Sequence, residues 1–158
     1  MGTLSLTSPA FEHNGTIPAK YTCDGNSELS PPLSISGVPE GAQSLVLIMD
    51  DPDVPRELKA DGVFDHWTLF NIPPDTHEIP EGAIAGEAGA NSSGAAGYTG
   101  PCPPPEYEPS EHRYVFALYA LSGPLLRFAE IPTKRQVLSA LEPLVLEKAE
   151  LIGRYSRT

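Results

Sequence analysis

The sequence predicts a mostly all-β protein, an antiparallel two-sheet β-sandwich with one short helix near its C-terminus. Three observations predict this class. The chain has 18 prolines and 14 glycines in 158 residues, which favours short strands and turns over long helices. Its apolar runs are short, and only one late segment has helical periodicity. The sequence shows no internal repeat and no linker, so residues 1–158 are expected to form a single domain.

Several short apolar runs predict the strands. Residues 44–50 are continuously apolar after a turn and predict a strand that is buried on both faces. Residues 66–72 predict a second strand, which two prolines terminate. Residues 112–121 predict a third strand with two largely apolar faces, as expected of a central strand. The segment 149–155 has a strand-like pattern and closes the fold.

The helix is expected at residues 133–142. Thr133 with Gln136 three residues later is typical of a capping box, and apolar residues follow at helical spacing. Pro143 is expected to end or kink this helix. The segment 82–111 is rich in glycine, alanine and proline. Its second half, from Asn91 onward, is interpreted as ordered and functional.

Charge and composition exclude several classes of partner. The formal net charge is −11 and no cluster of basic residues exists, so binding to nucleic acid or adsorption to anionic lipid is disfavoured. No run approaches the ~20 apolar residues of an integral membrane segment, and the first residues do not resemble a secretory signal. A cytoplasmic location is therefore expected, with Cys23 and Cys102 reduced. Two cysteines alone make no zinc pattern.

Three short segments carry polar side chains at places where a site could form. They are DDPDVP at residues 50–55, His66 at the start of a strand, and the loop 97–104 with the strand residues 111–114 behind it. Each also has a purely structural interpretation: a proline turn with solvated carboxylates, a structural histidine, and a salt bridge from Arg113. On the third strand His112 and Tyr114 share one face, while Arg113 points to the other.

Taken together and in order, these motifs resemble one family. The motifs are YTCDGN at 21–26, SPPL at 30–33, DDPDVP at 50–55, DHW at 65–67, GPCPP at 100–104, HRY at 112–114 and AELIGRYS at 149–156. In this order they are similar to the phosphatidylethanolamine-binding protein family, in its bacterial and archaeal, Raf kinase inhibitor-like branch (the YbhB/YbcL type). The resemblance extends from about residue 4 to residue 157.

The resemblance implies a two-sheet sandwich with a small anion pocket at one end. The ligand-binding residues carried over by position are Asp51, Asp53, His66, Pro104, His112 and Tyr114. The ligand would be a small phosphorylated or carboxylate molecule, such as phosphate, phosphorylethanolamine or an acetate-like anion. The aspartates would orient the histidines and favour their charged forms, and the histidines would donate to the anion. No catalytic residue, cofactor or metal is implied.

The sequence departs from the family pattern in four places. Residues 105–110 lengthen the loop before His112, and residues 56–63 lack the pocket tyrosine of mammalian members. Leu144 stands where many bacterial members have a histidine. The chain also ends soon after its last strand, without the C-terminal helix that flanks the pocket in mammalian members, so a more open pocket is expected.

Three classes of function remain open at this point. The first is a binding protein that regulates or inhibits a kinase or protease, as the resemblance implies. The second is a phosphate-ester or acyl hydrolase that uses an Asp–His pair, although no nucleophile motif occurs. The third is a structural adaptor, if the 105–110 loop blocks the pocket. The resemblance also implies a cis Val54–Pro55 bond, close approach of Cys23 and Cys102, and a homodimer.

Overall fold

Two antiparallel β-sheets form the framework of the molecule. A computed structural model describes residues 2–157. A three-stranded sheet has the order β1-β2-β5, and a five-stranded sheet has the order β6-β4-β3-β7-β8. All strand pairs within the two sheets are antiparallel. The strands are β1 (Ser5–Thr7), β2 (Leu33–Ser36), β3 (Ser44–Asp51), β4 (Phe64–Ile72), β5 (Glu78–Ile79), β6 (Glu87–Ala88), β7 (Glu111–Leu121) and β8 (Val145–Ser156).

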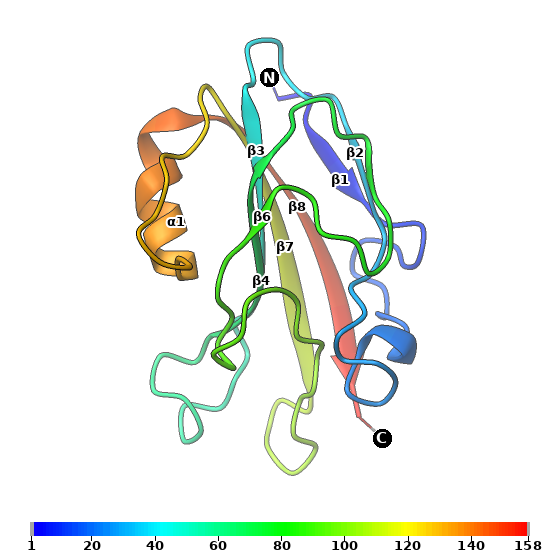
Figure 1. Cartoon of the computed structure of the whole chain (residues 1–158). Helices are drawn as coiled ribbons and strands as arrows, with labels where there is room; N and C mark the ends of the chain where they lie inside the picture. The colour runs from blue at the N-terminus through cyan, green and yellow to red at the C-terminus, as the bar shows by residue number, and fades with distance from the viewer. Residues whose placement is uncertain (1, 158) are drawn as a thin grey trace.

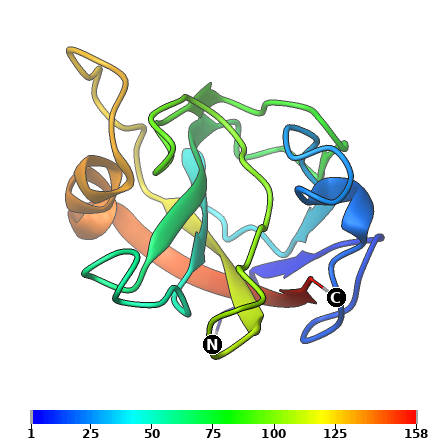
Figure 2. The same ribbon diagram turned by 90° about the horizontal axis from the view of Figure 1, so that it is seen from below.

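The five-stranded sheet is covered on both faces. The small sheet packs on one face, and α1 (Lys134–Leu141) lies against the other, as Figures 1 and 2 show from two directions. Strand β3 contributes side chains to both resulting cores in alternation. Leu47 and Met49 belong to the core between the sheets, whereas Val46 and Ile48 belong to the core beneath α1. The prediction of a strand buried on both faces is therefore confirmed.

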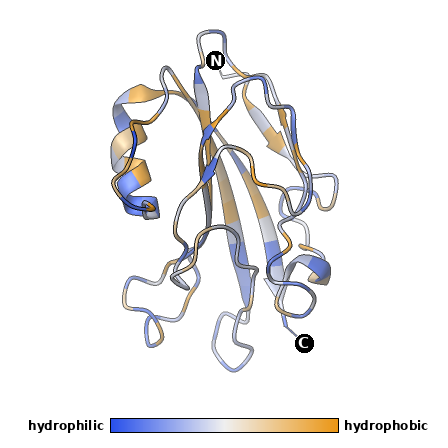
Figure 3. Ribbon diagram, in the orientation of Figure 1, coloured by the Kyte–Doolittle hydropathy of each residue, from blue (hydrophilic) through white to orange (hydrophobic). Residues whose placement is uncertain are grey.

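The other predicted strands are confirmed, with one difference in length. Strands β4 and β7 cover the predicted segments 66–72 and 112–121. Strand β8 begins at Val145 rather than at residue 149. Its first residues are exposed and carry no alternating apolar signal, because pairing with β7 defines this part of the strand. The ribbon in Figure 3 is coloured hydrophobic along the middle of β7 and hydrophilic at its lower end.

The capping box at Thr133 is present and starts the helix. The Thr133 side chain accepts from the backbone N–H of Gln136, and the Gln136 side chain accepts from the backbone N–H of Thr133. After α1 the chain makes a short 3₁₀ turn, η2 (Glu142–Leu144), which contains Pro143. A second 3₁₀ turn, η1 (Ala19–Tyr21), lies near the N-terminus. Among residues 2–157, no helix is long and apolar enough to cross a membrane.

Two covalent expectations are wrong. Val54–Pro55 is trans, and the cis X-Pro bond within residues 2–157 is Glu108–Pro109 in the lengthened loop. Cys23 and Cys102 are not reduced but form a disulfide, with Cα atoms 5.4 Å apart. The two loops that carry them are brought together by backbone hydrogen bonds, such as Cys23 N–H to the carbonyl of Pro101 at 3.1 Å. The close approach of the two cysteines that the resemblance implies is therefore confirmed, and only their expected reduced state is wrong.

Candidate ligand pocket

A pocket of about 590 Å³ opens where three neighbouring strands meet their loops. Asp51 ends β3, while His66 and His112 lie near the beginnings of β4 and β7. Because β3 pairs antiparallel with both neighbours, the end of β3 lies beside the starts of β4 and β7. The loops that follow β3 and precede β7 close the pocket at the lower end of the molecule (Figure 1). The lining residues are Asp51, Val54, Leu58, Lys59, Phe64, His66, Ser92, Thr99, Gly100, Cys102, Pro103, Pro104 and His112.

A β-bulge in β4 turns His66 toward the pocket. Met49 lies opposite Trp67, but Asp50 lies opposite Asp65, so His66 is the extra residue between the two pairs. An extra residue in one strand changes which side chains share a face. The shift lets His66 line the pocket together with Asp51, while its neighbour Trp67 belongs to the core between the sheets.

Asp50 and Asp65, the neighbours of Asp51 and His66 in the chain, face away from the pocket toward α1. Asp50 and Asp65 both contact Lys134 of α1, at 3.3 and 2.7 Å. Burial raises the pKa of Asp50, although the Lys134 charge opposes this shift. Strand alternation therefore divides the acids of residues 50–53: Asp50 faces the helix, and Asp51 faces the pocket.

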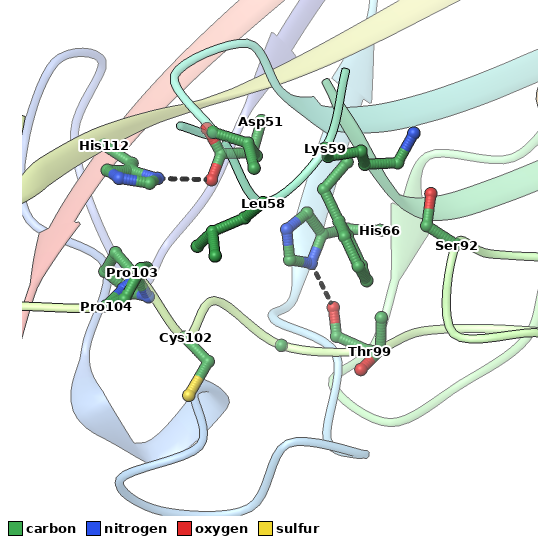
Figure 4. A pocket seen from close by; sticks show the side chains of 13 residues that line it. Asp51, Leu58, Lys59, His66, Ser92, Thr99, Cys102, Pro103, Pro104 and His112 are labelled. Carbon is green, nitrogen blue, oxygen red and sulfur yellow. Dashed lines mark hydrogen bonds and ion pairs between the residues drawn. The ribbon is translucent and has the colours of Figure 1, made fainter. Parts of the chain in front are cut away.

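Asp51 and His112 form a buried pair in the pocket wall. His112 Nδ1 lies 2.6 Å from Asp51 Oδ2 (Figure 4), and the two side chains are 1% and 4% exposed. Asp51 Oδ1 accepts from the backbone N–H of Asp53 at 2.8 Å, which fixes the carboxylate. Burial alone would lower the pKa of His112, but the hydrogen bond and the charge of Asp51 outweigh it and raise that pKa above its usual value. The second ring nitrogen, Nε2, is buried without a hydrogen-bond partner among residues 2–157.

His66 has a different environment. Its Nδ1 lies 2.6 Å from the carbonyl oxygen of Thr99, and its ring packs 4.7 Å from Phe64 and 5.3 Å from Tyr114 between centroids. Burial lowers the pKa of His66, and the hydrogen bond to Thr99 and the nearby carboxylates do not fully offset this. Near neutral pH His66 is therefore the uncharged histidine, and His112 is the one that takes a proton more readily.

Asp53 and Tyr114 lie beside the pocket without lining it. Asp53 forms a two-pronged ion pair with Arg113, with nitrogen–oxygen distances of 3.0 and 2.8 Å, and this pair lowers the pKa of Asp53. The structural salt bridge from Arg113 is therefore present. Tyr114 is 0% exposed, its hydroxyl has no partner among the described residues, and burial followed by the charge of Asp51 raises its pKa. The pocket thus brings together Asp51, His66, Pro104 and His112.

Several lining residues were not among the predicted ligand-binding residues. Leu58 and Lys59 come from the loop after β3, and Lys59 pairs with the nearby Asp61 at 3.0 Å. Thr99 contributes the carbonyl that orients His66, and Cys102 lines the wall while bonded to Cys23. Their role depends on how three loops meet. Residues 2–157 hold no group of three or more histidine, cysteine or acidic side chains arranged for a metal ion.

The fold and the pocket together define a β-sandwich protein with a buried Asp–His pair in the wall of a largely apolar cavity. A family model for phosphatidylethanolamine-binding protein matches residues 7–156. The chain therefore belongs to the phosphatidylethanolamine-binding protein family.

Individual relatives agree over the whole chain. A UPF0098 protein of Chlamydia pneumoniae is 44% identical over 156 residues, covering 98% of this chain and 100% of the relative. A UPF0098 protein of Methanothermobacter thermautotrophicus is also 44% identical, with coverages of 98% and 99%.

Solved structures agree with the fold. The crystal structure of a phosphatidylethanolamine-binding protein homolog from Chlamydia trachomatis matches with a TM-score of 0.92 at 42% identity, and covers all of both chains. That of Escherichia coli YbcL, described as a member of the mammalian family, matches with a TM-score of 0.86 at 26% identity and covers 99% and 100% of the two chains.

Proposed function

We propose that this protein is a binding protein, not an enzyme, and that its pocket captures a small phosphorylated or carboxylated ligand. The observation that carries the proposal is the buried pair of Asp51 and His112, in which the other ring nitrogen of His112 has no partner at hydrogen-bond distance among residues 2–157. A buried polar atom without a partner costs free energy, so such an atom in a pocket wall is suited to a ligand. Membership of the family supports an anionic ligand.

The charge on His112 gives the pocket its selectivity for anions. The protein carries a net charge of −11, so the overall field repels an anion and a local donor must attract it. Asp51 raises the pKa of His112 and so favours the protonated ring, whose Nε2–H can then donate to the ligand. The apolar part of the wall, including Leu58, Phe64 and Pro104, excludes water and strengthens that contact.

A regulatory role fits this kind of site. A pocket that binds a phosphorylated or carboxylated group can bind the same group on a small molecule or on a protein, and we propose a kinase or a protease as the target. Loop residues line much of the pocket, and loops at the surface are where a larger partner can approach. Binding of a phosphopeptide, but not of its unphosphorylated form, to immobilised protein would support recognition of the group on a protein.

Calorimetric titration with phosphorylethanolamine and with acetate tests the binding function. We expect binding that weakens as pH rises through the raised pKa of His112, because the ring loses its charge. His112→Ala should weaken binding by about tenfold or more, the value of a charge-assisted hydrogen bond. His77→Ala is the matched control, since His77 is exposed and lines a different hollow. Equal affinities for the two variants would show that the ligand binds elsewhere.

A hydrolase is the second candidate, because an Asp–His pair at 2.6 Å is also the geometry of a general base. A nucleophile or an activated water would then have to reach His112. No hydroxyl of residues 2–157 hydrogen-bonds to His112 Nε2. Turnover of a chromogenic phosphate ester or acyl ester that disappears in His112→Ala would favour the hydrolase. Binding without turnover would favour the binding protein.

A further inference from the structure

His66 presents a hydrogen-bond acceptor to a pocket that is otherwise suited to an anion. Its Nδ1 lies 2.6 Å from the carbonyl oxygen of Thr99. A carbonyl oxygen only accepts hydrogen bonds, so Nδ1 carries the hydrogen and donates it. In the neutral ring the other nitrogen, Nε2, then carries a lone pair. Thr99 thereby fixes the tautomer of His66.

That lone pair is free to meet a ligand. His66 is 4% exposed, and the hydrogen bond to the Thr99 carbonyl is the only one that its side chain makes within residues 2–157. Figure 4 shows the second ring nitrogen turned away from Thr99, toward the space between the labelled side chains. His66 lines the pocket, so a ligand that carries a donor can take the place of water at this atom.

The surroundings keep the ring neutral. The charged and titratable groups around His66 are Asp51 from β3, Asp65 from β4, His112 and Tyr114 from β7, and Lys59 from the loop after β3. The two carboxylates favour a charged ring, but burial opposes it more strongly and His112 opposes it too, so the pKa of His66 is lowered. The two histidines of the pocket are therefore complementary: His112 donates, and His66 accepts.

A neutral acceptor in an anion pocket discriminates between anions. A fully deprotonated oxygen placed against the Nε2 lone pair is repelled, whereas an oxygen that carries a hydrogen can donate to it. Inorganic phosphate carries at least one hydroxyl near neutral pH, and a phosphomonoester carries one below its second pKa of about 6. Sulfate and phosphodiesters carry none on the anionic group in this range.

We propose that His66 is a specificity-determining residue, which selects inorganic phosphate and phosphomonoesters over sulfate and phosphodiesters. The proposal rests on the function proposed above, because it assumes that the pocket binds an anion. It assigns the two contacts of the anion: a deprotonated oxygen faces the protonated His112, and the hydroxyl of the same group faces His66 Nε2. A free phosphomonoester would fit both contacts, and a phospholipid headgroup, being a diester, would lack the second.

The test compares four probes by calorimetry at about pH 6, where about half of a phosphomonoester still carries its hydroxyl, at constant ionic strength: inorganic phosphate against sulfate, and methyl phosphate against dimethyl phosphate. We expect the hydroxyl-bearing member of each pair to bind about tenfold to a hundredfold more tightly. This is the usual difference in affinity between a ligand that satisfies a buried acceptor and one that leaves it without a hydrogen bond. Dimethyl phosphate stands for a lipid diester, so the second pair also separates the two sources of phosphate.

His66→Asn withdraws the acceptor from the ligand and keeps the other contact. The Asn Nδ2 group can replace Nδ1 as the donor to Thr99, and the Asn Oδ1 then lies near the position of the ring Cδ2, short of the position of Nε2. We expect the phosphate-to-sulfate affinity ratio to fall to near one in this variant, and to remain at the wild-type value in His77→Asn. If His66→Asn does not fold, the nitrogen chemical shifts of His66 in the wild-type protein should still identify a neutral ring with hydrogen on Nδ1.

Three outcomes would overturn the selection by His66. The first is equal affinity of the wild-type protein for phosphate and sulfate. The second is sulfate binding that takes up one proton from the buffer, and the third is a nitrogen NMR spectrum that places the hydrogen of His66 on Nε2. Proton uptake is measured by repeating the sulfate titration in two buffers of different ionisation enthalpy. Failure of all four probes to bind would overturn the anion-binding function itself. Tight but unselective binding would overturn the selection alone.

Discussion

At the scale of single residues, the pocket makes two histidines chemically different through their hydrogen-bond partners. His112 meets a carboxylate, which stabilises its protonated form, and His66 meets a carbonyl oxygen in a buried setting, which leaves it neutral. Neither the preference of His112 for the protonated form nor the neutral state of His66 is a property of histidine in general; each follows from the partner of the ring. A carboxylate partner adds a negative charge, whereas a carbonyl adds only a dipole, so the carboxylate gains more when the ring is protonated.

Asp51→Asn should move the pH dependence of ligand binding to lower pH. The folded-state pKa of His112 is raised, so its proton, and the anion affinity that needs it, is lost as pH rises through that pKa. The amide keeps the size of the side chain but removes the charge, so the proton should be lost at a lower pH. NMR titration of the His112 ring beside phosphorylethanolamine titrations at several pH values would measure both. Asp75→Asn, at an exposed position outside the pocket, is the control, and an unchanged midpoint would contradict the assignment.

At the scale of elements, loops rather than strands complete the pocket wall. The segment from Thr99 to Pro104 orients His66 and contributes several lining residues, so its position matters for the site. The disulfide holds this segment to the loop at Cys23, and backbone hydrogen bonds join the same two loops: Cys23 N–H to Pro101 at 3.1 Å and Gly100 N–H to Ser27 at 2.8 Å. The loop is therefore held by two kinds of contact.

Removing the disulfide should affect stability more than binding. The bridge spans 79 residues, and closing a loop of that size is expected to stabilise the fold by about 4 kcal/mol, mainly through the unfolded state. The double variant Cys23→Ser, Cys102→Ser should lose about this much in free energy of unfolding, measured with denaturant. Its phosphate affinity should change by less than about tenfold, because the backbone hydrogen bonds remain. Reductant should destabilise the wild-type protein and leave the double variant unchanged. A wild-type protein indifferent to reductant would show that the bridge does not form.

At the scale of the whole molecule, the five-stranded sheet separates two cores and one functional end. One core lies between the sheets and the other beneath α1, so the sheet is held on both faces (Figures 1 and 2). This rigid support lets the pocket be built from loops without loss of position. Strand β8 is the last strand of the sheet order, and its first residues, including Val145 and Leu146, are exposed.

We predict that the protein forms a two-fold homodimer. Residues 14–17 hydrogen-bond to Ile152 and Arg154 and so cover the second half of the β8 edge. The first residues of β8, with their exposed apolar side chains, can pair with the same residues of a second copy across a two-fold axis. Sedimentation equilibrium at high micromolar concentration should give twice the chain mass. Leu146→Lys should shift the equilibrium toward the monomer, while Leu126→Lys, on the loop before α1, is a control of equal charge. A wild-type protein that sediments as a monomer would contradict the prediction.

The sequence by itself determined which segments form the main strands and the helix. The apolar run 44–50 needs burial on both faces wherever the strand is placed, and Thr133 with Gln136 caps a helix using atoms only three residues apart. These signals are local, so they can be read without the fold. The order of the motifs also identified the family, and with it the histidines and Asp51 of the pocket.

The tertiary structure alone decided how those residues act. Three features of the site depend on contacts between segments far apart in the chain. They are the bulge at His66, the pairing of Cys23 with Cys102, and the different partners of Asp50, Asp51 and Asp53, which contact Lys134, His112 and Arg113 respectively. A period of two places Asp51 on a face of its strand, but it does not say which side chain that face meets. The partner determines the charge of a buried histidine. The chemistry of the pocket therefore follows from the packing of strands and loops, which local periodicity does not encode.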